Sequence, residues 1–372
     1  MSRIASPRSI IVIATRQIGD VLLVTPLLRS LRRAYPDSII DVLVYSMKGG
    51  MLEGNPDCNS VIESKEHPDW REYLTLIRRI VRRYDLSVTT QSNDRGHIYA
   101  LLSGHRRVGV VPKLTPGSVW KYISCAVYVP NDNSDVHTVV QNLMLADAIG
   151  IRREHDVVPP GRPDADQLVD SLLPWSADEP FAVLHPLPMW NYKRWTLAGW
   201  RGLIQALRKR SFRVVLTGGP DNNEKNYCAE LVDGPDVVSL AGSLPFGALP
   251  ALIRRSKLFV GPDTSLTHLA AACGIPTVAI YGPSNPIKWG PWPSGCQEAL
   301  SPYVMKATPW QSNRNVVLVQ APQPPERDNC VPCLRQGCDG HKRSFSRCLE
   351  LLDVNTVVGA VETVLGYPET IG

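Results

Sequence analysis

The segment 260-VGPDTSLTHLAAACGIPTVAIYGPSNP-286 decides the fold class and raises the question of function. An apolar run at 258–261 predicts a strand, the alanine-rich stretch 266–273 predicts a helix, and 277–281 predicts a second strand. A strand, a helix and another strand in this order form a βαβ unit, which requires a parallel sheet. At the junction of the first strand and the helix stands a cluster of polar residues: Asp263, Thr264, Ser265 and Thr267.

The same alternation runs through both halves of the chain. In the first half, strands at 10–14 and 39–44 flank a helix at 20–33; in the second, strands at 181–185 and 212–217 flank a helix at 197–208. The Pro- and Asp-rich stretch 152–180 is weakly periodic and predicts a linker. We therefore expect an α/β protein of two Rossmann-like, doubly wound domains that face each other across a cleft.

The expected domain bounds follow from this reading. The first domain covers 1–155, the second covers 175–350, and the stretch 351–372 carries a helix at 354–364, for which packing on the second domain and packing back on the N-terminal domain are both open. In such sheets ligands bind at the carboxyl ends of the strands.

Composition indicates a soluble folded protein with an acidic partner. Of the 372 residues, 44% are apolar and 20% are charged, and no apolar run reaches the roughly 20 residues that span a bilayer. The N-terminus reads as a strand and not as a signal peptide. Nine cysteines, an odd number, fit reduced thiols in the cytoplasm. Many arginines fall in the first third of the chain; they indicate an acidic partner or, as the alternative, solvated helix faces.

The first candidate site is the strand-to-helix turn 15-TRQIGDVLLVTP-26. Gly19 allows the chain to bend, and Asp20 stands at the start of the helix, facing the expected cleft. The alternative is that Asp20 caps the helix, a position in which Asp is favoured. The turn matches neither the dinucleotide-binding nor the P-loop pattern.

Two further turns supply polar groups in the second half. In 185-HPLPMWNYKRWTLAGWRGLI-204, Lys193 and Arg194 precede a helix and form a candidate anion site, with a solvated basic pair as the alternative. In 216-LTGGPDNNEKN-226, Gly218 and Gly219 allow close approach of a ligand, and Asp221 or Glu224 is placed to accept a hydrogen bond from a ribose or a base.

The polar cluster at 263–267 is the last of the candidate site turns. Hydroxyl groups and unpaired backbone amides at a helix N-terminus suit a diphosphate. A helix cap needs one such residue, so four of them indicate a ligand.

These motifs together resemble a known family. The stretches 19-GDVLLVTPLLRSLRRAYPD-37, 193-KRW-195, 218-GGP-220 and 262-PDTSLTHLAAACGIPTVAIYGPSNP-286 resemble, in order and spacing, the ADP-heptose:lipopolysaccharide heptosyltransferases of glycosyltransferase family 9. The resemblance covers roughly residues 10–365. It implies the GT-B fold, with the acceptor bound by the N-terminal domain and the nucleotide sugar by the C-terminal one.

The resemblance also implies roles for single residues. The family's general base falls on Asp20 and its pyrophosphate lysine on Lys193. Its donor-binding helix falls on four residues, of which His268 has helix packing as the alternative role: Asp263, Thr264, Ser265 and His268. Two departures stand out. Ser265 replaces a frequent Gly, and 186-PLP-188 replaces possible phosphate-binding hydroxyls.

The implied reaction is an inverting transfer of a heptose from ADP-heptose to the inner core of lipopolysaccharide, with no metal cofactor for catalysis. Lys193, Arg194 and the amides at Thr264 would stabilise the diphosphate, and Asp20 would take the proton of the acceptor hydroxyl. An acidic Kdo/heptose core at the inner membrane face agrees with the basic first domain, for which the acceptor-binding candidates are Arg16, Arg71 and Arg95. The protein is expected in the cytoplasm, or peripheral at the inner membrane, with no nucleic acid as partner.

One segment, 330-CVPCLRQGCDGHKRSFSRC-348, stands apart from these motifs. Its four cysteines, Cys330, Cys333, Cys338 and Cys348, match a tetrahedral Zn or Fe site of a structural kind. The alternatives are free thiols or local disulfides.

Two alternatives to the main function remain. The same donor chemistry could act on a protein or on a secondary metabolite, because no acceptor motif is readable. The other alternative is a non-catalytic nucleotide-sugar-binding protein.

Overall fold

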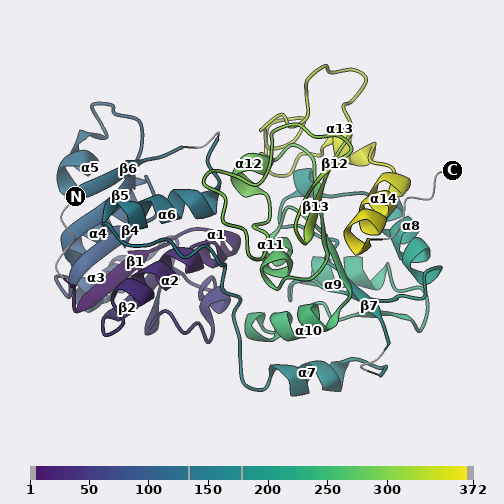
Figure 1. Ribbon diagram of the computed structural model, residues 1–372, viewed down its shortest axis with the longest axis horizontal. Helices are drawn as coiled ribbons and strands as arrows, with labels where there is room; N and C mark the ends of the chain where they lie inside the picture. The colour runs from purple at the N-terminus through teal and green to yellow at the C-terminus, as the bar shows by residue number, and fades with distance from the viewer. Residues whose placement is uncertain (1–5, 133–134, 177–178, 367–372) are drawn as a thin grey trace. The chain divides into compact units, whose positions relative to one another are not determined.

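A computed structural model describes residues 6–132, 135–176 and 179–366. The chain divides into two compact units between Pro160 and Gly161 (Figure 1). The first unit extends a few residues beyond the expected bound at 155. The reason is that the backbone amides of Glu154 and Val158 donate hydrogen bonds of 2.8 Å to the hydroxyls of Ser30 and Thr25, respectively.

The first unit is built on a six-stranded parallel sheet of order β3-β2-β1-β4-β5-β6. The strands are β1 (Ser9–Ile13), β2 (Ile39–Tyr45), β3 (Ser60–Ser64), β4 (Tyr84–Thr89), β5 (Gly104–Val111) and β6 (Val127–Pro130). The helices are α1 (Ile18–Leu22), α2 (Thr25–Ala34), the 3-10 helix η1 (Gly49–Leu52), α3 (Trp70–Ile80), α4 (Asp94–Ser103), α5 (Val119–Ser124) and α6 (Thr138–Ala148).

Helices α3 and α4 cover one side of this sheet. Leu76 and Ile80 of α3 share a buried cluster with Tyr99 of α4 and Ile11 of β1. Helices α2 and α6 pack against each other. The near-continuous apolar runs of β1 and β4 are explained by burial of a parallel strand on both faces.

The second unit is built on a seven-stranded sheet of order β12-β13-β11-β10-β7-β8-β9. The strands are β7 (Phe181–Leu184), β8 (Arg213–Leu216), β9 (Val237–Ser239), β10 (Leu258–Pro262), β11 (Thr277–Tyr281), β12 (Trp310–Asn313) and β13 (Val316–Gln320). All pair in parallel except β12, which forms an antiparallel hairpin with β13 that the sequence analysis did not predict.

The helices of this unit fill the connections between strands. They are α7 (Ala165–Leu172), η2 (Asn191–Lys193), α8 (Leu197–Arg208), α9 (Asn222–Ala229), η3 (Phe246–Ala248), α10 (Leu249–Arg255), α11 (Ser265–Ala272), α12 (Pro286–Trp289), α13 (Arg347–Glu350) and α14 (Val354–Leu365). The last helix, α14, packs against α8 and β13, and its buried residues Val357, Ala360 and Val361 belong to the core of the second unit.

Strand order reverses once in each sheet. In the first unit the chain runs from β1 outward to β3 and then returns to β4 on the other side of β1. In the second unit it runs from β7 outward to β9 and returns to β10 on the other side of β7. The carboxyl ends of β1 and β4, and of β7 and β10, are therefore the switch points at which open α/β sheets bind ligands.

Candidate active site

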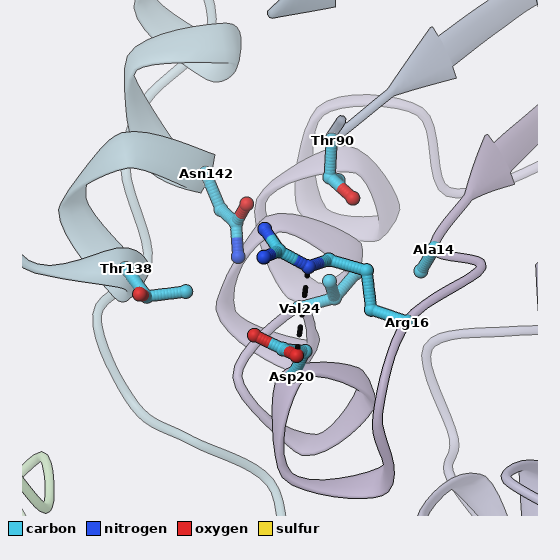
Figure 2. Close-up of a pocket in the computed structure, with 7 residues that line it drawn as sticks. All are labelled: Ala14, Arg16, Asp20, Val24, Thr90, Thr138 and Asn142. Atoms are coloured by element: carbon cyan, nitrogen blue, oxygen red, sulfur yellow. Dashed lines mark ion pairs between the residues drawn. The ribbon is translucent and has the colours of Figure 1, made fainter. Parts of the chain in front are cut away.

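The switch point of the first unit holds a pocket around Asp20. Figure 2 shows the side chains that line it, with the Arg16 guanidinium beside the Asp20 carboxylate. They come from the ends of β1 and β4, from α1 and from α6: Ala14, Arg16, Asp20, Val24, Thr90, Thr138 and Asn142.

Asp20 lies inside α1 and does not cap it. The helix begins at Ile18, and its N-cap residue is Gln17, whose side chain makes no capping hydrogen bond. The alternative interpretation of Asp20 as a helix cap is therefore wrong. Its carboxylate instead lies 3.5 Å from Nε of Arg16, four residues earlier in the chain, and forms an ion pair with it. The Asp20 side chain is 13% exposed and that of Arg16 is 45% exposed, so the pair stands at the mouth of the pocket.

Buried polar side chains hold the wall opposite Asp20. Asn142 of α6 is buried, and its Nδ2 donates a hydrogen bond of 3.0 Å to the carbonyl of Leu23. Thr90, directly after β4, is also buried and donates to the carbonyl of Ile13 at 3.1 Å. These bonds fix the helix and the strand end that surround the carboxylate.

The switch point of the second unit holds an ion pair between Lys193 and Asp263. Nζ of Lys193, in the loop after β7, lies 2.5 Å from Oδ2 of Asp263, which follows β10. The two side chains are 20% and 8% exposed. Burial, the largest single effect, would raise the pKa of Asp263. The charge of Lys193, the neighbouring His268 and hydrogen bonds from Lys193 and Ser284 together outweigh it, so the pKa is lowered. Asp263 thus stays ionised and holds the lysine at the end of the strand.

Helix α11 begins beside this pair. Its N-cap residue is Thr264, whose hydroxyl makes no capping hydrogen bond and lies 3.3 Å from that of Thr267. Thr267 donates to the carbonyl of Pro262 at 2.6 Å. The hydroxyls of the polar cluster therefore bond to one another and to the strand end, and they leave the first-turn amides of α11 uncapped by the Thr264 side chain.

Two buried histidines flank the same point. Burial lowers the pKa of His185, at the end of β7, to about 4, although its Nδ1 bonds the carbonyl of Thr217 at 3.1 Å. Burial likewise lowers the pKa of His268 in α11 to about 4, despite the carboxylate of Asp263. Nδ1 of His268 is buried without a hydrogen-bond partner among the described residues. Both rings are neutral at neutral pH.

The remaining donor-site candidates lie in the turns that follow β7 and β8. Glu224 accepts a hydrogen bond of 2.6 Å from the amide of Gly219, and a Cβ at Gly218 would meet Ala241 at 3.2 Å. Arg194 is exposed after η2, and its charge acts on Tyr227 of α9. Glu224, in the first turn of α9, therefore holds the turn after β8 through its carboxylate.

Two of the three arginines assigned to the acceptor do not line the Asp20 pocket. The guanidinium of Arg71 lies 5.1 Å from the ring centre of Trp70 at the start of α3. That of Arg95 bonds the hydroxyl of Tyr45 at 3.1 Å and the carbonyl of Glu66. Only Arg16 of the three stands in the pocket.

A sequence model of glycosyltransferase family 9 (heptosyltransferase) matches residues 74–327. The chain belongs to this family. Lipopolysaccharide heptosyltransferase 3 of Escherichia coli is 29% identical over 286 residues, which cover 74% of this chain and 83% of the relative. Lipopolysaccharide heptosyltransferase 2 of E. coli K12 is 25% identical over 299 residues, with the same two shares. The protein is thus a glycosyltransferase of the lipopolysaccharide heptosyltransferase kind.

Solved structures agree with this family 9 fold. A glycosyltransferase of family 9 from Veillonella parvula superposes with a TM-score of 0.73 at 17% identity and covers 96% of this chain and 97% of its own. The E. coli heptosyltransferase WaaC with ADP superposes with a TM-score of 0.69 at 19% identity, over 96% and 99%. The expectation of two Rossmann-like domains in a GT-B fold is confirmed.

The described residues give no support for a metal site at the four cysteines of this heptosyltransferase. No group of three or more His, Cys, Asp or Glu side chains among the described residues is arranged to hold a metal ion. Cys330, Cys333, Cys338 and Cys348 are free thiols, and burial, followed by the neighbouring Cys333, raises the pKa of Cys348 to about 12. The expectation of a structural Zn or Fe is therefore not supported, although the four thiols lie close enough for Cys330, Cys333 and Cys338 to act on the pKa of Cys348.

Several residues of both sites were not predicted from the sequence. Thr90, Thr138 and Asn142 line the Asp20 pocket. Thr138 and Asn142 are polar residues in the otherwise apolar helix α6, and this contrast could have indicated them. Tyr281, whose hydroxyl donates to Asp263 Oδ1 at 3.4 Å, lies within the motif 260–286 but was predicted only as part of a strand.

The two histidines predict a pH dependence of stability. An unfolded histidine has a pKa of about 6.5, whereas that of His185 and His268 is about 4 in the fold. Between these values the unfolded chain binds protons that the folded one does not, so the free energy of unfolding should fall as the pH drops from about 6.5 to about 4. Urea unfolding at a series of pH values measures this fall, which should be shallower for His268→Gln. The exposed His105 provides the control, and a slope for His268→Gln equal to that of His105→Gln would contradict the assignment.

Proposed function

We propose that this enzyme transfers a heptose from ADP-heptose to a sugar hydroxyl of the lipopolysaccharide inner core, with inversion at the anomeric carbon. The observation that supports this most is the placement of Asp20 and of Lys193 with Asp263 at the ligand-binding switch points of their sheets. A nucleotide-sugar-binding protein without activity would have no use for the pocket carboxylate.

In the proposed reaction the second unit binds the donor. As the bond between the anomeric carbon and the diphosphate breaks, negative charge grows on the leaving ADP. Lys193 and the amides at the start of α11 would stabilise this charge, with Arg194 at the rim. Asp263 would keep Lys193 in place through their ion pair of 2.5 Å. Ser265, His268, Gly218, Gly219 and Glu224 would complete the nucleotide site. These groups are already charged or oriented, so this stabilisation needs no divalent metal.

The first unit would supply the base. The Asp20 carboxylate would accept the proton of the attacking acceptor hydroxyl, which approaches the anomeric carbon from the face opposite the diphosphate. A single displacement of this kind inverts the configuration. It requires that both units reach the same anomeric carbon when the two substrates are bound.

The acceptor we propose is an acidic Kdo/heptose core attached to lipid at the cytoplasmic face of the inner membrane. The support is the set of relatives, which are lipopolysaccharide heptosyltransferases, and the cation of Arg16 beside Asp20. Arg71 and Arg95 would contact outer parts of such an acceptor. No described helix is long and apolar enough to cross a membrane.

The test combines donor binding with product analysis. ADP at about 100 times its Kd should raise the free energy of unfolding by about 2.7 kcal/mol, whereas UDP and GDP should not. Incubation with ADP-heptose and heptose-deficient core lipopolysaccharides should release ADP and give a product whose anomeric configuration NMR can read.

Two results would count against the proposal. Stabilisation by UDP or GDP in place of ADP would exclude the proposed donor. ADP binding without transfer to any core acceptor would favour a protein or a secondary metabolite as the acceptor, or binding without catalysis.

A further inference from the structure

Four arginines lie at and just after the C-terminal end of α3. Arg78, Arg79, Arg82 and Arg83 are exposed, and their guanidinium groups make no hydrogen bond or ion pair with any residue in the described ranges. The amide of Arg82 bonds the carbonyl of Leu102 at 2.8 Å, which joins the end of α3 to the end of α4. The cluster is therefore held in place by the backbone while its side chains remain in solvent.

The carboxylates of the neighbouring elements are already engaged. Glu72 pairs with Lys65, and Asp94 pairs with Lys121 at 2.8 Å. Asp69 caps α3, and Asp85 accepts the amide of Arg8 at 2.7 Å. The positive charge of the four arginines is thus not neutralised within this part of the molecule.

Large apolar side chains lie on the same outward side. Leu76 and Ile80 of α3 face the core, whereas Trp70, Leu74 and Val81 on or next to α3 are 68%, 42% and 40% exposed. On α4, which packs beside α3 on the same side of the sheet (Figure 1), Ile98 and Leu101 are 38% and 46% exposed. We call this set the α3–α4 face; it consists of Trp70, Leu74, Arg78, Arg79, Val81, Arg82, Arg83, Ile98 and Leu101.

We propose that the α3–α4 face docks on an anionic lipid bilayer. Helices that lie in a membrane interface combine Arg or Lys with exposed Trp and Leu, as this face does. A nucleic acid would use the arginines but would leave the exposed leucine, isoleucine and valine side chains without a partner. Charge and apolar surface together therefore favour lipid.

The need for docking rests on the proposed function, because an acceptor anchored in lipid is available only at the bilayer surface. The α3–α4 face covers one side of the sheet, whereas the Asp20 pocket opens at the carboxyl ends of β1 and β4. Docking through this face thus leaves the pocket uncovered.

Vesicle co-sedimentation of the full chain tests the proposal. The wild type should bind vesicles of phosphatidylethanolamine and phosphatidylglycerol, bind phosphatidylcholine vesicles far more weakly, and lose binding at high salt. Each arginine near an anionic surface contributes about fivefold to the partition coefficient, so Arg78→Gln, Arg79→Gln and Arg83→Gln together should lower it about a hundredfold. Leu74→Ser should lower it less, by an amount that salt does not change.

The matched control removes the same charge elsewhere. Arg33, Lys257 and Arg327 are exposed and make no ion pair with described residues, so replacing all three by Gln should leave vesicle binding nearly unchanged. Equal losses in both triple variants, or no binding of the wild type to anionic vesicles, would overturn the proposal. So would a single-stranded oligonucleotide that binds the α3–α4 face and displaces the vesicles.

A second readout separates this inference from the proposed function. Transfer to a delipidated, water-soluble core oligosaccharide should be equal in the wild type and in the α3–α4 triple variant. If both proteins lack transfer while vesicle binding follows the expected pattern, the proposed function fails and the docking surface stands. If transfer is normal but vesicle binding does not depend on the arginines, the docking surface fails alone.

Discussion

Asp20→Asn should lower the turnover number by about a thousandfold or more, in the range set by general-base catalysis, and leave the Kd for ADP nearly unchanged. Asn keeps the size of the side chain but cannot accept the proton of the acceptor hydroxyl. The pocket of Asp20 lies in the first unit, whereas the proposed ADP site lies in the second. Single-turnover assays with ADP-heptose measure the first effect, and ADP titration calorimetry measures the second.

The ion pair with Arg16 requires a control for structure. Asn at position 20 also weakens the 3.5 Å contact with the guanidinium. Because Arg16 is 45% exposed, the loss of free energy of unfolding should stay below about 1 kcal/mol. Asp37→Asn, which changes an exposed carboxylate of the same unit, should behave like the wild type in every assay. Retained turnover in Asp20→Asn would remove Asp20 from the role of base, and a parallel loss of ADP affinity would indicate a wider disturbance.

Lys193→Met should both destabilise the protein and abolish ADP binding. Asp263 is 8% exposed, and without Lys193 its charge would be buried with no cation 2.5 Å away. Removing one partner of a buried ion pair costs about 3–5 kcal/mol, and the partial exposure of Lys193 places the expected loss near the lower end. Urea unfolding measures the loss, and titration calorimetry measures ADP affinity.

A double variant separates stability from binding. Lys193→Met combined with Asp263→Asn removes the uncompensated charge, so most of the lost free energy of unfolding should return while ADP affinity should not. Because the pKa of Asp263 is lowered in the fold, the pair stabilises above the unfolded pKa of the carboxyl, and this stability is lost only in strong acid. All measurements therefore belong at neutral pH. Lys257→Met, at an exposed lysine, is the control. Unchanged stability in Lys193→Met would mean that the ion pair does not hold the site, and unchanged ADP affinity would place the diphosphate elsewhere.

Strands and site-bearing turns could be predicted from local sequence. The apolar runs that became β1, β7, β10 and β11 are buried on both faces, so periodicity and turn residues indicated them directly. Asp20, Lys193 and Asp263 follow three of these strands. They were predicted as site residues because the carboxyl ends of parallel strands lie at one edge of a sheet, where ligands bind. The hairpin of β12 and β13 was not predicted; β13 pairs in parallel with β11 and in antiparallel with β12, whose short polar sequence 310-WQSN-313 gives little indication of a strand.

Contacts between side chains that are far apart in the chain could not be predicted from the sequence. Asp263 is the counter-ion of Lys193, 70 residues away along the chain, and the N-cap position of α11 falls on Thr264. Asn142 of α6 lines the Asp20 pocket, whereas the sequence pattern of this segment indicates only a buried helix. The four cysteines show the reverse case, in which spacing indicated a metal site for which the described residues give no support.

The sequence by itself determined the fold class, the family and the turns at which polar groups gather, because these depend on hydrophobic period and on residues adjacent in the chain. Only the tertiary structure decided which of those groups meet. Lys193 and Asp263 pair because strand order places β7 beside β10. The four arginines at and after the end of α3 have no ion pair with a described residue, and the neighbouring carboxylates are held elsewhere. Both facts depend on distances between segments that chain order alone does not fix.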